Sequence, residues 1–285
     1  MAKEPQVKIA RHQLPVDVAH ENYEFSSQRL GEVVVNAHKR AASLYHVVRK
    51  AWDVILYGSA AAANPVEFAK PLELGAHAGV AFFRVSAAGP GPIEFRLGLD
   101  TVKLTADSVD SSVAHSGLWM QAFRLAVLGR ESESIEALCH ISTDLLRRST
   151  TRGPEFHNLF VDAVKAFWTG AKDAAGLLSA TLAASDPKRA DVTVPEFDAH
   201  HWIPEIKLIE SLLNRTSRFD EALTEAVLLH QKYYSSTERR GRESYGFLAA
   251  GPLTWAAVAH DRGVSFDLES DYLPRSLVQG RYSKE

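Results

Sequence analysis

The chain contains a single cysteine, Cys139, and it lacks any apolar run long enough to cross a membrane. One cysteine excludes a disulfide within the chain, and such sparing use of cysteine is typical of proteins from a reducing compartment. A membrane-spanning helix needs about 18 or more consecutive apolar residues. The segment Met1–Pro15 also lacks the apolar core of a secretion signal. We therefore expect a cytoplasmic protein that does not enter a membrane.

The familiar motifs of catalysis and cofactor binding are also absent. The sequence has no G-x-x-x-x-G-K-[ST] phosphate loop, no G-x-G-x-x-G dinucleotide motif, no G-x-S-x-G nucleophile turn and no H-E-x-x-H zinc motif. The formal net charge of −3 argues against general nucleic-acid binding, because phosphate contacts need a clustered basic surface. We therefore expect no enzymatic activity, no cofactor and no direct contact with nucleic acid.

What the chain does have is the composition of a folded protein and long stretches of helical periodicity. Its 46% of hydrophobic and 24% of charged residues can form a sizeable core. No change of composition and no long linker divides it, so we expect one domain over residues 1–285. Apolar residues follow helical spacing in most segments. The expected helices cover residues 16–36, 41–58, 67–87, 107–130, 132–148, 155–169, 171–184, 192–214, 217–233 and 247–262.

Short turns separate about ten helices, which predicts a mainly α-helical fold of stacked αα-hairpins in the manner of tetratricopeptide arrays, without a fixed repeat period. One insert departs from this pattern. Ile93, Phe95 and Leu97 alternate with polar residues, and the alternation resumes at Val102 and Leu104. This predicts a β-hairpin over residues 93–105, with its apolar face on the helices because a lone hairpin is barely stable.

The most apolar segment of the chain lies between Phe247 and Ala259. Since it is apolar on all sides, we expect a helix at the centre of the core. Pro252 fits its first turn, and Gly263 fits the left-handed position that ends a helix. Beyond Gly263, apolar and acidic residues alternate up to Glu269, which predicts a short extended segment with an acidic face.

The same region carries a family resemblance. Its main features are Gly-Pro-Leu at residues 251–253, His-Asp-Arg-Gly at residues 260–263 and Glu-Ser-Asp-Tyr-Leu-Pro at residues 269–274, with Tyr-Tyr at 233–234 and Ile-Ala-Arg-His at 9–12. Together they resemble the signature of the immunity protein 49 family, whose members are bacterial, common in actinomycetes, and assigned to protect cells from a cognate polymorphic toxin. The resemblance implies a helical protein that binds and neutralises a protein toxin stoichiometrically. Such binding depends on shape and charge complementarity.

Two other functions stay open from the residues alone. One is a helical-repeat adaptor. The other is a helical hydrolase with a metal site around His200 and His201, because side chains three or four residues apart on a helix can converge on an ion. The neighbouring carboxylates are Glu196, Asp198 and Glu205. We favour the simpler interpretation of polar residues at a junction between a loop and a helix, and we therefore expect no metal.

Other residues with chemical potential have structural explanations. Cys139 and His140 are neighbours on a helix and therefore point in different directions, so Cys139 is expected to be a small, partly buried apolar residue. His230 and His260 are expected to pack in or beside the core, with hydrogen bonds to the backbone.

Two charged stretches are candidates for partner binding. Glu238–Glu243 contains Arg239 and Arg240, which form either an anion-binding patch or, as we favour, a loop whose arginines pair with nearby acids. The second stretch contains Asp267, Glu269, Asp271 and Tyr272. Acidic and aromatic side chains suit a protein interface. Equally, Tyr272 and Leu273 would pin the carboxy-terminal tail to the core. The candidate contact residues are Asp267, Glu269, Asp271, Tyr272, Arg239 and Arg240.

The apolar segment generates a first prediction. Trp255 should be fully buried, and replacing it with alanine should destabilise the protein by about 3–5 kcal/mol through lost burial and a cavity. Denaturant unfolding of Trp255→Ala measures this cost. An unchanged midpoint would place the core elsewhere.

Overall fold

Helices make up most of this computed structural model, which describes residues 7–14, 16–106, 110–151, 153–186, 196–214 and 218–282. The first half contains α1 (Val16–Ala37), α2 (Leu44–Ala60), α3 (Ala69–Ala88), α4 (Ser116–Gly129), α5 (Ser132–Cys139), α6 (Thr143–Arg147) and α7 (Glu155–Thr169). The second half contains α8 (Ala174–Ala184), α9 (Glu196–His200), α10 (Trp202–Leu213), α11 (Phe219–Ser235), α12 (Glu238–Gly241), α13 (Ala250–Asp261) and α14 (Arg275–Gln279). The mainly α-helical prediction is confirmed.

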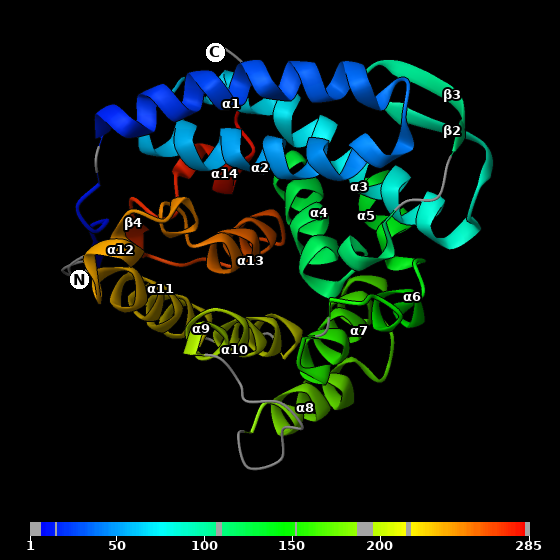
Figure 1. Cartoon of the computed structure of the whole chain (residues 1–285). Coiled ribbons are helices and arrows are strands. Elements are labelled where there is room, and N and C mark those ends of the chain that lie inside the picture. The colour runs from blue at the N-terminus through cyan, green and yellow to red at the C-terminus, as the bar shows by residue number, and fades with distance from the viewer. Residues whose placement is uncertain are drawn as a thin grey trace.

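Successive helices pack against each other along the chain. Helices α1, α2 and α3 lie side by side, and α3 continues onto α4 (Figure 1). The pairs α7–α8 and α10–α11 form the opposite side of the molecule. This arrangement is the expected stacking of αα-hairpins. No described helix is both long and apolar enough to span a bilayer.

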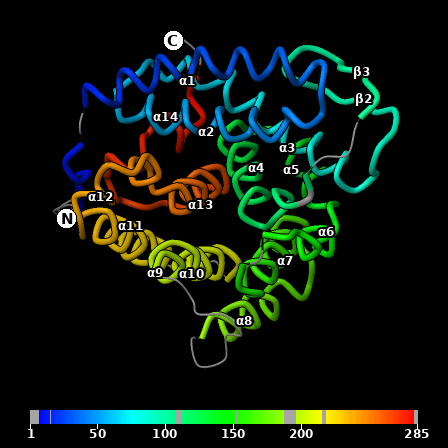
Figure 2. The backbone as a smooth tube through the Cα atoms, in the orientation of Figure 1, coloured from blue at the N-terminus to red at the C-terminus, as the bar shows by residue number. Residues whose placement is uncertain are grey.

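Helix α13 occupies the centre of this arrangement. It lies between the layer of α1–α3 and the α10–α11 pair (Figure 2), and it contacts α4, α10, α11 and α14. Every residue from Gly251 to Ala259 is buried, and Trp255 is 0% exposed. Pro252 lies in the first turn and Gly263 has a φ of 71°. The predicted central helix is therefore confirmed, together with its start and end signals.

The predicted hairpin is also confirmed. Strand β2 (Gly91–Leu97) pairs antiparallel with β3 (Asp100–Ala106), and Phe95 lies opposite Val102. These two side chains and Leu97 are buried, with α3 as the covering helix. The charged side chains Glu94, Arg96 and Lys103 face away and are exposed.

A second, smaller sheet joins segments from opposite ends of the chain. Strand β1 (Lys8–Ile9) pairs in parallel with β4 (Glu269–Ser270). The sequence predicted an extended, acidic segment after α13, but strand pairing begins only at Glu269 and its partner was not foreseen. The pairing ties the amino-terminal segment to the end of the chain.

Three predicted helices differ from the structure in where they begin or break. Helix α4 begins at Ser116, well after residue 107, because Nδ1 of His115 accepts a hydrogen bond from the Leu118 amide (3.3 Å) and caps the helix. The helix expected over 132–148 breaks after Cys139, and Ser142 caps a new one. The helix expected over 192–214 breaks at His201. The expected starts at residues 107 and 192 and the expected cap at Ser217 lie outside the described residues.

Glycine allows α3 and α4 to approach closely. A Cβ atom on Gly79 would lie 2.4 Å from the Cβ of Ala122, a distance that side chains do not adopt. Gly75, one turn earlier, would meet Leu125 at 2.6 Å. Because the Cβ of Ala122 is bonded directly to the backbone of α4, it cannot move away from Gly79 unless a helix shifts.

Gly79→Ala is therefore expected to destabilise the protein by about 1–3 kcal/mol through overpacking, despite the better helix propensity of alanine. Gly31→Ala is the matched control, because nothing lies within 4 Å of the added atom on α1. That change should stabilise the fold by about 0.5–1 kcal/mol. Urea unfolding of both variants tests the packing. Equal effects at the two sites would contradict it.

Candidate functional site

The structure places the predicted acidic stretch at the junction of the two ends of the chain. Tyr272 is 0% exposed, so its side chain belongs to the core. Glu269 forms an ion pair with Arg275, and the Asp271 carboxylate accepts a hydrogen bond from the Arg11 amide (3.1 Å). The Arg11 guanidinium also donates to the Asp271 carbonyl. These contacts favour the tail-pinning interpretation for these three residues.

Asp267, the first residue of the acidic stretch, is exposed. The two arginines of the basic stretch, Arg239 and Arg240, have different surroundings. Arg240 pairs with Glu196 (2.7 Å) and lies 4.0 Å above the ring of Tyr233. This agrees with the interpretation that the loop arginines pair with local acids. Arg239 is exposed on α12. Asp267 and Arg239 are thus the two predicted contact residues whose side chains face solvent without a described ion pair.

His12 brings three separate stretches of the chain together. Its Nδ1 accepts from the Tyr272 hydroxyl (2.7 Å), and its Nε2 donates to the Gly241 carbonyl (3.1 Å). Its ring also stacks with Tyr234 at 6.1 Å between centroids. The segments at residues 9–12, 233–234 and 269–274, which carry the family resemblance, therefore meet at one point. No local sequence pattern indicated this meeting.

Around His12 lies a set of packed rings that we call the histidine–tyrosine cluster. His230 stands at its centre, 4.7 Å from Tyr234, 4.9 Å from Tyr272 and 5.2 Å from His201 between ring centroids. The prediction that His230 packs in the core and bonds to backbone is confirmed, since its Nε2 donates to the Gly246 carbonyl (3.1 Å). The prediction for His260 is wrong, since it is exposed in the last turn of α13, where its Nδ1 lies 3.1 Å from the Asp261 carboxylate. The members of the cluster are His12, His201, His230, Tyr233, Tyr234 and Tyr272.

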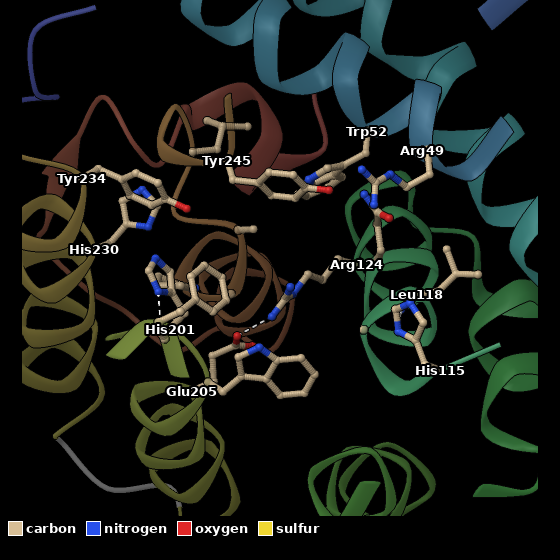
Figure 3. A pocket seen from close by; sticks show the side chains of 18 of the residues that line it. Arg49, Trp52, His115, Leu118, Arg124, His201, Glu205, His230, Tyr234 and Tyr245 are labelled. Carbon is tan, nitrogen blue, oxygen red and sulfur yellow. Dashed lines mark hydrogen bonds and ion pairs between the residues drawn. The ribbon is translucent and has the colours of Figure 1, made fainter. Parts of the chain in front are cut away.

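A pocket of about 220 Å³ opens beside this cluster (Figure 3). Helices α2, α4, α10 and α11 and the start of α13 each contribute to its wall. Figure 3 shows His201 and His230 on one side, Arg49 and His115 on the other, and Arg124 and Glu205 joined between them. His201, Glu205 and His230 carry predictions from the sequence, but no sequence pattern indicated that they line one pocket.

The Glu205 carboxylate is the deepest charge in the wall, at 1% exposure. It forms an ion pair with Arg124 and accepts a hydrogen bond from Nε1 of Trp255 (2.9 Å). Burial raises the pKa of Glu205, and the Arg124 charge opposes that rise. Gly251 makes room for the carboxylate, since a Cβ there would lie 2.1 Å from Cδ of Glu205. The three contacts fix α4, α10 and α13 relative to one another.

Four buried polar atoms of the pocket residues have no hydrogen-bond partner in the structure. They are Nε2 of Gln121, Nε of Arg124, Nε2 of His201 and Nδ1 of His230. The partners of the other ring nitrogens define the tautomers. Nδ1 of His201 donates to the Phe197 carbonyl (2.8 Å), so its Nε2 is an acceptor. Since Nε2 of His230 is likewise a donor, its Nδ1 is an acceptor too. The pocket therefore offers two free donors, on Gln121 and Arg124, and two free acceptors, on His201 and His230.

Both of these histidines are neutral at ordinary pH. Burial lowers the pKa of His201 to about 4 and lowers the pKa of His230 well below its usual value. Burial also lowers the pKa of His115 on the far side of the pocket.

The residues considered as a metal site are held by separate partners. His200 and His201 each direct Nδ1 to a backbone carbonyl four residues earlier, at 2.9 and 2.8 Å. Each carboxylate has its own ion pair: Glu196 with Arg240, Asp198 with His157 and Glu205 with Arg124. The arrangement favours the junction interpretation over a shared ion.

Among the described residues, the ligand atoms of Glu73, His77 and Glu131 come within 4.8 Å of one another. Nδ1 of His77 accepts a hydrogen bond from the Gly98 amide (3.1 Å), so its Nε2 carries the proton and faces Glu131 at 3.3 Å. A metal at Nε2 would have to displace that proton and break the hydrogen bond between His77 and Gly98 of the hairpin.

Cys139 is partly buried, as predicted, and burial raises the pKa of its thiol to about 11, which makes it a poor nucleophile.

The outer side of α11 carries an acidic surface that adjoins Asp267. The Asp267 amide donates to the Asp220 carboxylate (3.2 Å), which places these two acids together. Two apolar side chains are exposed beside them, Val7 at 47% and Leu228 at 46%. An open hollow of about 530 Å³ follows this side of the helix, and Lys232 also lines it. Glu225 pairs with Lys207 at 2.8 Å. We call this surface the α11 face and define it by Val7, Asp220, Glu221, Glu225, Leu228 and Asp267.

Comparison with known proteins identifies one relationship. The family model described as Immunity protein 49 matches residues 61–277 of the 285-residue chain. The match begins just after α2 and ends within α14. It includes the pocket residues of α4, α10 and α11 and all of α11, but not Arg49 and Trp52 on α2. No curated protein and no solved structure matches the chain.

The neutral buried histidines predict how stability depends on pH. Their pKa is lower in the folded state than the ordinary value of about 6.5. Above that pH the two histidines are neutral in both states, so the free energy of unfolding is not reduced by their titration. As the pH falls from about 6.5 towards 4, the unfolded chain binds protons that the folded chain does not. At about pH 5 the loss should be on the order of 2 kcal/mol for His201.

Urea unfolding at about pH 7 and about pH 5 checks this for the wild type, His201→Gln and the exposed-site control His20→Gln. His201→Gln should lose less stability on acidification than the wild type, whereas His20→Gln should follow the wild type. If His201→Gln shows the same pH dependence as the wild type, His201 is not buried as a neutral ring.

Proposed function

The chain belongs to the immunity protein 49 family, and on that premise we propose that it protects a bacterium by binding a cognate protein toxin stoichiometrically and blocking its action. The family match carries the proposal, because it extends over most of the helices rather than over a single motif. Neutralisation by binding needs a complementary surface and no chemistry of its own. We further propose that the protein meets its toxin in the cytoplasm, which its single cysteine supports.

We propose the α11 face as the surface that contacts the toxin. It combines exposed apolar side chains, Val7 and Leu228, with the exposed carboxylates of Glu221 and Asp267. The exposed Glu225 carboxylate belongs to the same rim and shares its charge with Lys207. Interfaces commonly have an apolar centre that excludes water and a charged rim that steers association. The chemistry of the rim suits a toxin with a basic surface around its active site.

The contacts within the molecule support this choice over the whole predicted acidic stretch. Glu269 and Asp271 are engaged with Arg275 and Arg11, and Tyr272 is in the core. Asp267 is exposed and leads directly to the acids of α11. We therefore retain Asp267 as a contact residue and assign the other three to holding the segment that carries it.

Neutralising the rim tests the proposed surface. We expect Glu221→Gln/Glu225→Gln/Asp267→Asn to slow association with the toxin by about tenfold at low salt, because these charges attract a basic partner. At high salt, screening should bring the variant and the wild type together. Stopped-flow or surface-plasmon measurements of the association rate at both salt concentrations provide the readout.

The control is Asp17→Asn/Glu21→Gln/Glu24→Gln, which removes the same charge from exposed positions on α1. It should associate at the wild-type rate. If both triple variants bind alike, the α11 face is not the contact surface. Failure of the wild-type protein to bind the toxin would instead contradict the proposed function itself.

A further inference from the structure

The pocket between α2, α4, α10 and α11 has features that toxin binding does not use. We propose that it is a binding site for a small organic monoanion, namely a carboxylate that also carries a hydrogen-bond donor on a flat or apolar body. The proposal is independent of the toxin and of the α11 face. It depends on the size of the pocket, its charge, its unpartnered atoms and its walls.

Size limits the ligand to roughly one ring. The volume of about 220 Å³ lies between an apolar cavity of about 150 Å³ that accommodates benzene and the roughly 300 Å³ at which drug-sized pockets begin. It is much larger than the space that one or two bound waters need. A molecule of about ten non-hydrogen atoms fits this range.

The charge of the lining favours an anion. Arg124 is balanced by Glu205, with which it pairs. Arg49 also lines the pocket, and among the described residues no carboxylate lies within ion-pair distance of its guanidinium. Since the lining histidines are neutral near pH 7, one positive charge is left over. A singly charged carboxylate would compensate it.

The unpartnered atoms define the rest of the ligand. Nε of Arg124 and Nε2 of Gln121 are free donors, and both suit a carboxylate oxygen. Nε2 of His201 and Nδ1 of His230 are free acceptors, so they require a hydroxyl or amino group on the ligand. His230 is 2% exposed, so a donor that reaches it must enter the pocket. Leaving such atoms unpaired is costly in a buried site.

The walls and the rim complete the site. Trp52, Trp202 and Leu248 line the pocket with apolar surface on which a flat body can pack. Three lining residues, Arg49, Phe197 and Tyr245, are also exposed to solvent. They therefore form the opening of the pocket. Apolar walls with a few convergent polar groups are the usual composition of a small-molecule site.

Three probes separate these requirements. 4-Hydroxybenzoate has the anion, the ring and the donor, benzoate lacks the donor, and phenol lacks the anion. Isothermal titration near neutral pH in a low-chloride buffer should give saturable, one-to-one binding of 4-hydroxybenzoate. Loss of either polar group should weaken the affinity about tenfold or more, as expected for a hydrogen bond to a charged or buried partner.

Arg49→Met tests the charged end of the site in the protein. Because Arg49 is exposed and makes no described ion pair, the variant should unfold at the wild-type temperature and bind 4-hydroxybenzoate about tenfold more weakly. Arg84→Met, an equally exposed change on α3, should bind like the wild type. A structure with 4-hydroxybenzoate bound should show its carboxylate at Arg49 and Arg124.

Several results would overturn the proposal. One is the absence of saturable binding up to about 10 mM 4-hydroxybenzoate, well above the Kd of a weak millimolar complex. Another is equal affinity for all three probes, or equal binding by Arg49→Met and the wild type. Ordered water alone in the pocket of crystals grown with the probe would also contradict it. None of these outcomes bears on toxin binding.

Discussion

The buried carboxylate of Glu205 is the constraint on which the centre of this molecule depends. A charge taken out of water must be paired and hydrogen-bonded, and breaking such a pair costs about 3–5 kcal/mol. Here Arg124 on α4 supplies the charge and Trp255 on α13 supplies a hydrogen bond. Gly251 is required because any side chain there would occupy the place of the carboxylate. Helices α4, α10 and α13 are therefore held in a single arrangement, and Arg124 and Glu205 also line the pocket.

Sequence periodicity was sufficient for the longer helices and the β-hairpin of this fold, because burial of one helix face or one strand face repeats locally. It did not predict β1, α12 or α14. The α13 segment, apolar on all sides, and the alternation at residues 93–104 both predicted their structures correctly. Breaks caused by a side chain were missed, since His115 and Ser142 cap helices through hydrogen bonds that apolar spacing does not reveal. The predicted and observed helices otherwise share most of their residues.

The site was harder to foresee than the fold. His201 and Glu205 were noticed because of their spacing, but their functional surroundings come from Arg124, His230 and Trp255, which lie in other segments. The contact of His12 with Tyr272 joins residues 260 positions apart and leaves no local pattern. Tyr272 looked like an interface aromatic because acids flank it, although its ring is in the core and its hydroxyl bonds to His12. Only the three-dimensional structure separates the pinned acids from the exposed Asp267.

Helix α11 contributes residues to both proposed binding sites, one on each of its sides. Its inner side supplies His230 and Tyr234 to the pocket, and its outer side supplies Glu221, Glu225 and Leu228 to the proposed interface. A helix held on its inner side by packed rings presents its outer side rigidly. Rigid surfaces lose less conformational entropy when they bind. This is the property that tight, stoichiometric inhibition requires.

The central claim is that protection comes from binding rather than from chemistry. Titrating a fixed amount of the cognate toxin with this protein, and measuring the residual toxin activity, tests it most directly. The account predicts a linear decrease that reaches zero near one equivalent, does not change with incubation time, and is reversed when the complex is denatured and the toxin is recovered. Complete, time-dependent inactivation by a small fraction of an equivalent would contradict it, because that is the behaviour of an enzyme acting on the toxin.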